Sequence, residues 1–116
     1  MKNVMSIAPY RVPKKNQKAF FELILEKKAY FLEKGYISQR MAMVLRSRKD
    51  PEILLEFFEW LGEPACESAK TDPVVLKYWE KMAGLWEDGG FGLIRIVESM
   101  EGVLLFDPLF DVIELD

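Results

Sequence analysis

The chain has 116 residues, which fits one domain, and we expect residues 1–116 to form a single domain with an extended tail at 101–116. Half of the residues are apolar and 13% are aromatic, enough for a core and too many for a disordered chain. The net charge of −3 argues against nucleic acid as a partner, because phosphate binding needs a basic surface. One cysteine, and no apolar run near the ~20 residues of a membrane-spanning helix, favour a cytoplasmic protein without a membrane partner.

The first third of the chain predicts a strand followed by a long helix. Residues 4–12 alternate loosely in β-forming side chains, and Pro9 among them indicates an edge strand or a bulge. The helix is expected to run from Asn16, its N-cap, to Lys34, and Gly35 ends it as a C′ residue. Its apolar side chains recur at helical spacing: Phe20, Phe21, Ile24, Phe31 and Leu32. Its charged side chains are assigned to the solvated side: Glu22, Glu26, Lys27 and Lys28.

A β-hairpin is predicted next. Residues 38–47 and 53–60 read as two strands, and the Asp50-Pro51 pair supplies the chemistry of the turn between them. In the first strand, alternation puts Arg40 and Arg46 on the same face.

Two helices and a final strand complete the predicted order. Gly62 and Pro64 open a short helix, and Asp72 caps the next one, with Pro73 in its first turn. The second of these helices carries an apolar stripe of Val75, Trp79, Met82 and Trp86. Residues 88–92 end it, a fourth strand is expected at 93–98, and the apolar tail resumes around an interruption at Asp107-Pro108.

The order β-α-β-β-α-α-β contains the split βαβ arrangement, so we predict an α+β, ferredoxin-like fold with a four-stranded antiparallel sheet. The helices would cover one face of this sheet, yet its strands are apolar on both sides: Met41, Met43, Leu45, Phe57 and Phe58. Such a bare face is larger than a monomer usually exposes. We therefore expect a homodimer in which two sheets close face to face into a dimeric α/β barrel.

Several short motifs resemble the antibiotic biosynthesis monooxygenase family of the dimeric α/β-barrel superfamily. They are Phe-Phe-Glu-Trp at 57–60, Ala-Lys-Thr-Asp-Pro-Val at 69–74, Tyr-Trp-Glu-Lys-Met at 78–82, Tyr-Arg-Val at 10–12 and Gly-Tyr at 35–36. The resemblance covers roughly residues 3–110. It implies a cavity between helices and sheet that takes aromatic polyketides or haem, with chemistry that needs neither metal nor flavin.

The departures from the family's motifs narrow this expectation. The haem-degrading branch relies on an Asn, a Trp and an iron-binding His, whereas this chain has no histidine. When the motifs are superposed on Trp60, that branch's Trp falls near Ala69 and its His near Trp79. Haem degradation is therefore not expected. The quinol-oxidising branch uses Asn, Trp and Arg, and the only asparagines here are Asn3 and Asn16. We expect no cofactor and no metal site, since no ligand cluster is visible.

Four side chains are candidates for binding a small aromatic ligand. Trp60 and Trp79 offer flat faces and N–H donors, although both also suit plain core packing. Arg40 could hold a carboxylate or phenolate if its strand face lines the cavity, and is otherwise a rim charge. Tyr10 could donate to a ligand oxygen or bond locally.

Glu56 is the candidate catalytic residue. It lies in an apolar strand, on the face opposite Glu59 and on the same face as Phe58 and Trp60. A carboxylate in a cavity can act as a base on a phenol or an acidic C–H. The alternative is a structural salt bridge to an arginine of a neighbouring strand.

Two functions remain open at this point. The first is a cavity protein for a small hydrophobic or aromatic molecule, in its catalytic form a cofactor-independent monooxygenase. The second is a non-catalytic homodimeric binding or interaction module with the same fold. A cavity of a few hundred Å³ with converging polar groups would favour the first, and a solidly packed interior the second.

Overall fold

The computed structural model describes the backbone of residues 3–86 and 106–108 and the side chains of residues 3–39 and 43–86. The elements, in chain order, are β1 (Val4–Arg11), α1 (Lys14–Lys34), β2 (Ile37–Ser47), β3 (Ile53–Trp60), α2 (Glu63–Thr71), α3 (Pro73–Ala83) and β4 (Phe106–Pro108). The strands form one antiparallel four-stranded sheet in the order β1-β3-β2-β4. This α+β architecture, with three described helices, is consistent with a ferredoxin-like fold.

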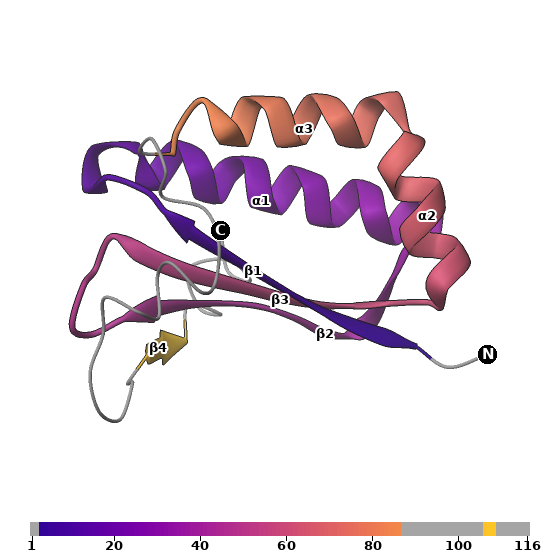
Figure 1. Ribbon diagram of the computed structural model, residues 1–116, viewed down its shortest axis with the longest axis horizontal. Helices are drawn as coiled ribbons and strands as arrows, with labels where there is room; N and C mark the ends of the chain where they lie inside the picture. The colour runs from indigo at the N-terminus through magenta and orange to yellow at the C-terminus, as the bar shows by residue number, and fades with distance from the viewer. Residues whose placement is uncertain (1–2, 87–105, 109–116) are drawn as a thin grey trace.

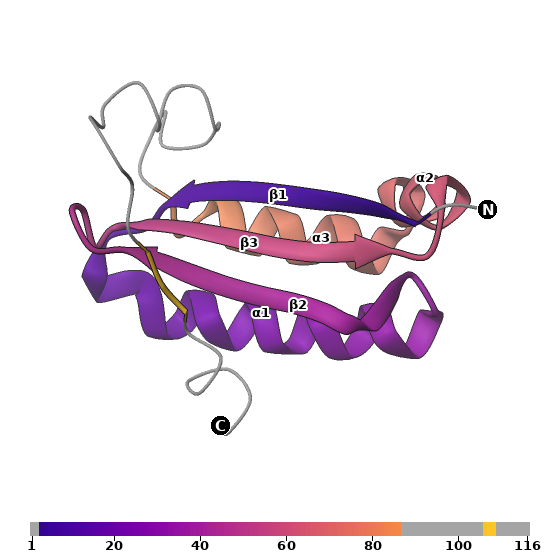
Figure 2. The ribbon, with the colours of Figure 1, turned by 90° about the horizontal axis from the view of Figure 1, so that it is seen from below.

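The helices all lie on one side of the sheet. In Figure 1, α1 and α3 run along the upper face and α2 closes one end, and Figure 2 shows β1, β3 and β2 lying in front of the helices when the sheet is viewed from below. The core between the two layers holds two clusters, one around Phe20, Ile24 and Leu54 and the other around Phe31, Phe58 and Trp60. Each fully buried side chain of this size stabilises the fold by about 1.5–3 kcal/mol.

The predicted elements of the first 83 residues are present, with shifted ends. The β3 strand has the predicted bounds, and Gly35 ends α1 in the left-handed conformation, with φ of 73°. The expected N-cap at Asn16 is wrong, because α1 begins at Lys14 after Pro13. Proline has no N–H and its fixed φ suits a helix start, while the Asn16 side chain instead donates from Nδ2 to the carbonyl of Leu85 at 3.2 Å.

The tail contributes the fourth described strand. We expected Asp107-Pro108 to interrupt it, but Asp107 pairs with Arg46 and Pro108 with Leu45 along β2. Proline is tolerated in edge strands, and β4 bonds only to β2 among the described strands. The strand predicted at 93–98, the glycine-rich helix end at 88–92 and most of the tail lie outside the described residues.

The register assigns each side chain of the sheet to a face. On the helix side, Tyr10, Leu54 and Arg46 form one row across β1, β3 and β2, since Tyr10 pairs with Leu54 and Leu54 with Arg46. On the other side, Ile7 and Phe57 pair within the β1–β3 ladder. The β2–β3 register shifts between Ile37 and Ala42, and the backbone of Arg40 lies inside this irregular stretch.

The face away from the helices is partly exposed. Met5 is 47% and Ile7 49% exposed on β1, and Phe57 is half-buried beside Ile7, whereas Leu55 is buried on the same face. The bare face expected from the sequence is thus concentrated toward β1 within the described part of the chain.

Asp72 joins the end of α1 to the start of α3. Its Oδ1 accepts the backbone N–H of Val74 at 2.9 Å and so caps α3, as predicted. Its Oδ2 accepts the hydroxyls of Tyr30 and Tyr36, each at 2.7 Å. The bonds from Tyr36 and then Tyr30 hold the pKa of Asp72 below its ordinary value of 3.8, and the bond to Asp72 raises the pKa of Tyr30 to about 12.

Replacing Asp72 by Asn should lower both the stability and the pKa of Tyr30. A carboxyl whose pKa is lowered by folding stabilises the protein above its unfolded pKa, and this contribution disappears as the pH falls through the folded pKa. The difference in unfolding free energy between wild type and Asp72→Asn should therefore be largest near neutral pH and vanish in acid.

Urea denaturation across the acid range and ¹³C-tyrosine NMR titration measure these two effects. Glu67→Gln is the control, since Glu67 accepts from the exposed Lys70 and from neither tyrosine. An unchanged Tyr30 titration in Asp72→Asn would contradict the assignment.

Candidate functional site

A buried polar cluster lies under α1, at the centre of the helix-covered sheet face. Glu56 Oε1 of β3 accepts a hydrogen bond from Tyr10 Oη of β1 at 2.9 Å and forms an ion pair with Lys27 Nζ of α1 at 2.8 Å. The Lys27 and Glu56 side chains are only 2% and 7% exposed. Side chains from β1, α1 and β3 therefore meet at one carboxylate oxygen.

Lys27 is the side chain that the sequence reasoning misplaced. It was assigned to the solvated side of the helix, yet it is 1% exposed. The error could have been avoided, because Lys27 follows Ile24 by three residues and precedes Phe31 by four, and so belongs to the buried stripe. A lysine on such a stripe requires an acidic partner in the core, and Glu56 supplies it.

Two aromatic rings lie close to the Lys27 ammonium group. The Nζ atom lies 5.5 Å from the ring centroid of Phe31 and 5.1 Å from that of Phe58, distances at which an aromatic face attracts a cation. Burial, followed by the charge and the hydrogen bond of Glu56, raises the pKa of Tyr10 well above its ordinary value. Tyr10 is accordingly a proton donor to Glu56, held between the rings of Phe20 and Trp86.

A cavity of about 390 Å³ adjoins this cluster, between the β1 side of the sheet and the helices. Its polar groups come from Ser6, Tyr10, Lys27, Cys66 and Lys70. Its apolar walls are Ala8, Phe58 and the three tryptophans Trp60, Trp79 and Trp86. The volume falls within the roughly 300–1,000 Å³ of small-molecule sites.

Three of the predicted binding residues line this cavity. Tyr10, Trp60 and Trp79 come from β1, β3 and α3 and share it. Trp60 is also a core residue, since it packs on Phe31 at 5.5 Å and donates from Nε1 to the Ser6 hydroxyl.

The other two candidate residues, Glu56 and Arg40, are not shown to line the cavity. Glu56 lies behind Tyr10 and Lys27 rather than in the cavity wall, and its salt bridge reaches a lysine of α1 instead of an arginine of a neighbouring strand. The side chain of Arg40 is outside the described part of the structure, so its role stays a prediction.

The geometry can position the oxygen of a ligand. The described interactions of Glu56 both end on Oε1, and the described hydrogen bond of Lys27 uses one of its three N–H groups. An ammonium group and a phenol therefore face an aromatic cavity. Within residues 3–86 and 106–108, no group of three or more His, Cys, Asp or Glu side chains is arranged to hold a metal ion.

No described helix combines the length and the apolar character needed to cross a membrane. In the comparisons with known proteins, no family model, no curated protein and no solved structure matches the chain. The family resemblance described above therefore stays a prediction that rests on the short motifs.

Breaking the Lys27–Glu56 pair should strongly destabilise the fold. Lys27→Met leaves the carboxylate buried without its cation, and Glu56→Gln leaves the ammonium without its anion, so each should cost about 3–5 kcal/mol of unfolding free energy. The double variant removes both charges and should recover most of this loss. Urea denaturation of the four proteins gives the coupling energy.

Lys70→Met is the matched control, because its ion pair with Glu67 is exposed on both sides and should contribute nothing measurable. Additive effects of the two single substitutions would contradict a coupled, buried pair.

Proposed function

We propose that this chain binds a small hydrophobic or aromatic molecule in the cavity beside Tyr10 and Lys27. The observation that carries the proposal is the joining of a cavity of about 390 Å³, walled by three tryptophans, to a buried cation and a phenol. Plain core packing would not require a charged pair at this depth. The preferred ligand has a flat apolar body for the tryptophans and one oxygen for Lys27 and Tyr10.

In the catalytic form of this proposal, the chain is a cofactor-independent monooxygenase like the family that its motifs resemble. A phenol of the substrate gives its proton to the Tyr10 oxygen while Tyr10 passes its own proton to Glu56. Lys27 then stabilises the phenolate by charge. The electron-rich substrate reacts with O₂ at a ring CH₂ that becomes C=O, and the second oxygen atom leaves as water, so no external reductant is needed.

A non-catalytic binding module is the second candidate. The specific observation in its favour is that Glu56 lies outside the cavity wall and is already neutralised by Lys27. In this case Glu56 acts only in stabilising the fold. The tryptophans, Tyr10 and Lys27 contact the ligand.

Filling the cavity separates ligand binding from other effects. Cys66 of α2 is half-buried and lines the cavity, so Cys66→Phe should occupy the space and weaken 2-naphthol binding about tenfold or more, whereas Cys66→Ala leaves it open. An NMR titration that follows the tryptophan indole N–H signals measures this binding. Equal affinities for Cys66→Phe and Cys66→Ala would overturn the proposed site.

Oxygen uptake with phenols whose keto tautomer carries a ring CH₂ then distinguishes the two candidates. Uptake that is lost in the Lys27→Met/Glu56→Gln double variant supports the monooxygenase. Binding of 2-naphthol without uptake across an aromatic panel supports the binding module.

We further propose that the chain is a homodimer whose sheets pack face to face into a dimeric α/β barrel. Three described helices cover one face of the sheet (Figure 2), while Met5 and Ile7 remain about half exposed on the other. Ile7 continues into an apolar row with its partner Phe57 and with Met43, which pairs with Phe57 from β2. A second copy offers the same row and needs no further partner.

Charging this face should dissociate the dimer. Met5→Lys/Ile7→Lys places two cations on the exposed row, and sedimentation should then show a monomer. The control is Val74→Lys/Leu76→Lys on α3, where the parent side chains are similarly exposed, at 41% and 47%, and the dimer should persist. A wild-type monomer at micromolar concentration would contradict the proposal.

A further inference from the structure

A second concave site lies on the other flank of α1, against β2. This surface hollow, of about 940 Å³, is lined by Lys14, Gln17, Lys18, Phe21, Glu22, Leu25, Arg46 and Pro51, and we refer to it as the basic hollow. It shares none of these residues with the aromatic cavity. Three of its side chains are cations and three are apolar.

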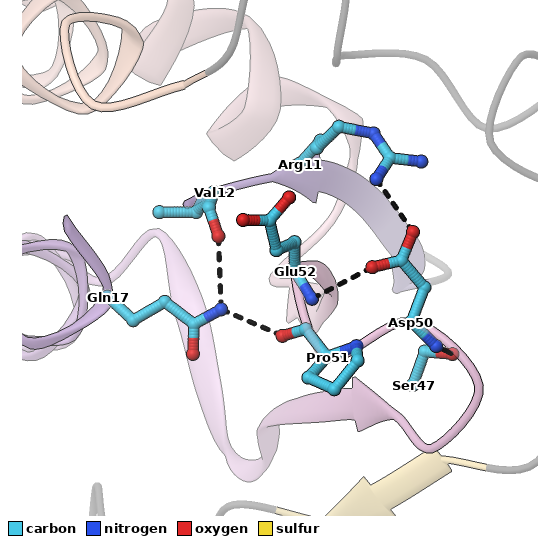
Figure 3. Close-up of polar contacts among 7 residues, drawn as sticks. All are labelled: Arg11, Val12, Gln17, Ser47, Asp50, Pro51 and Glu52. Atoms are coloured by element: carbon cyan, nitrogen blue, oxygen red, sulfur yellow. Dashed lines mark hydrogen bonds and ion pairs between the residues drawn. The ribbon is translucent and has the colours of Figure 1, made fainter. Parts of the chain in front are cut away.

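Gln17 fixes the position of Arg46 within the basic hollow. Figure 3 shows the Gln17 amide between two backbone carbonyls, to which Nε2 donates: that of Val12 at 3.0 Å and that of Pro51 at 2.8 Å. Because the amide nitrogen is satisfied twice, the amide oxygen must face the other way. It accepts a hydrogen bond from Arg46 Nη2 at 3.0 Å.

The turn that supports this amide is itself held by polar contacts. Pro51 belongs to the β2–β3 turn, which Asp50 holds by an ion pair with Arg11 at 2.7 Å and by accepting the backbone N–H of Glu52 at 3.2 Å (Figure 3). Arg46 is therefore placed by a network that connects the start of α1 to the turn.

The Arg46 guanidinium keeps an N–H donor that has no hydrogen-bond acceptor. Its Cζ lies 5.7 Å from the ring centroid of Phe21, and its Nε is buried with no hydrogen-bond partner. No ion pair to Arg46 is present within the described side chains. A buried donor left unpaired costs free energy, and an acceptor that reached it would remove this cost.

The remaining surroundings are also positive. Lys14 and Lys18 lie one turn apart at the start of α1, where the helix has no acidic residue in its first turn and no capping side chain. Glu22 is the one acidic residue in the described lining. The backbone of Asp107 in β4 pairs with that of Arg46 in the β2–β4 register.

We propose that the basic hollow binds an amphipathic anion, namely a carboxylate or phosphate ester that carries an apolar or aromatic group. The head group accepts from Arg46 and is attracted by Lys14 and Lys18. The apolar group lies over Phe21 and Leu25. This site is independent of the aromatic cavity, so its test does not depend on the function proposed above.

NMR titrations of the full chain with four probes test this site: octanoate, octyl phosphate, octanol and inorganic phosphate. Octanoate or octyl phosphate should shift the Arg46 Nε–H signal, and whichever binds more tightly identifies the head group. Octanol lacks the charge and inorganic phosphate lacks the chain, so both should bind at least about tenfold more weakly. If either binds as tightly as the amphipathic anions, or if the Arg46 signal does not move, the proposal is wrong.

Variants give a second readout. Arg46→Met keeps an apolar stem over Phe21 and should weaken octanoate binding about tenfold or more, while Arg48→Met, on an exposed residue of the following turn, should not. Because the wild-type Arg46 signal is followed directly, the test stands even if Arg46→Met folds poorly.

Discussion

The ion pair between Lys27 and Glu56 constrains the rest of this structure. Two opposite charges meet at 2.8 Å in a largely apolar core, and Tyr10 brings a third element to the same oxygen. Sliding α1 by one turn, about 5.4 Å, would break this contact and leave both charges in apolar surroundings. The pair therefore selects one placement of α1 on the sheet, and through Tyr10 it ties β1 to that placement.

The aromatic cavity follows from the same constraint. Lys27 needs a buried carboxylate, so the core is polar at its centre. The cavity beside Lys27 is lined by tryptophans rather than by compact aliphatic side chains. Large flat side chains leave space that their neighbours do not fill, and here Ser6, Ala8 and Cys66 are too small to close it. A charged group beside unfilled, aromatic-walled space is a common setting for a ligand site.

The sequence predicted those elements whose signals are local. Gly35 marks the end of α1, and Asp72 with Pro73 marks the start of α3. The hairpin strands show alternation of their own. The positions of these elements could therefore be predicted without tertiary information. Lys27 was missed because charge was taken as a sign of solvent, although its spacing placed it among buried residues. The pairing of β4 with β2 could not be foreseen, since a three-residue strand containing proline has no periodicity, and only its neighbour defines it.

One cross-strand row links the two proposed binding sites. Tyr10 at one end reaches the aromatic cavity and Arg46 at the other reaches the basic hollow, with Leu54 fully buried between them. Two strand spacings, roughly 10 Å, separate their backbones, and α1 lies across the row with Lys27 serving one site and Phe21 the other. The same helix thus forms a wall of both sites while its buried stripe keeps them apart. A ligand in either site contacts side chains that the other does not use, so the two sites can differ in chemistry without competing for the same residues.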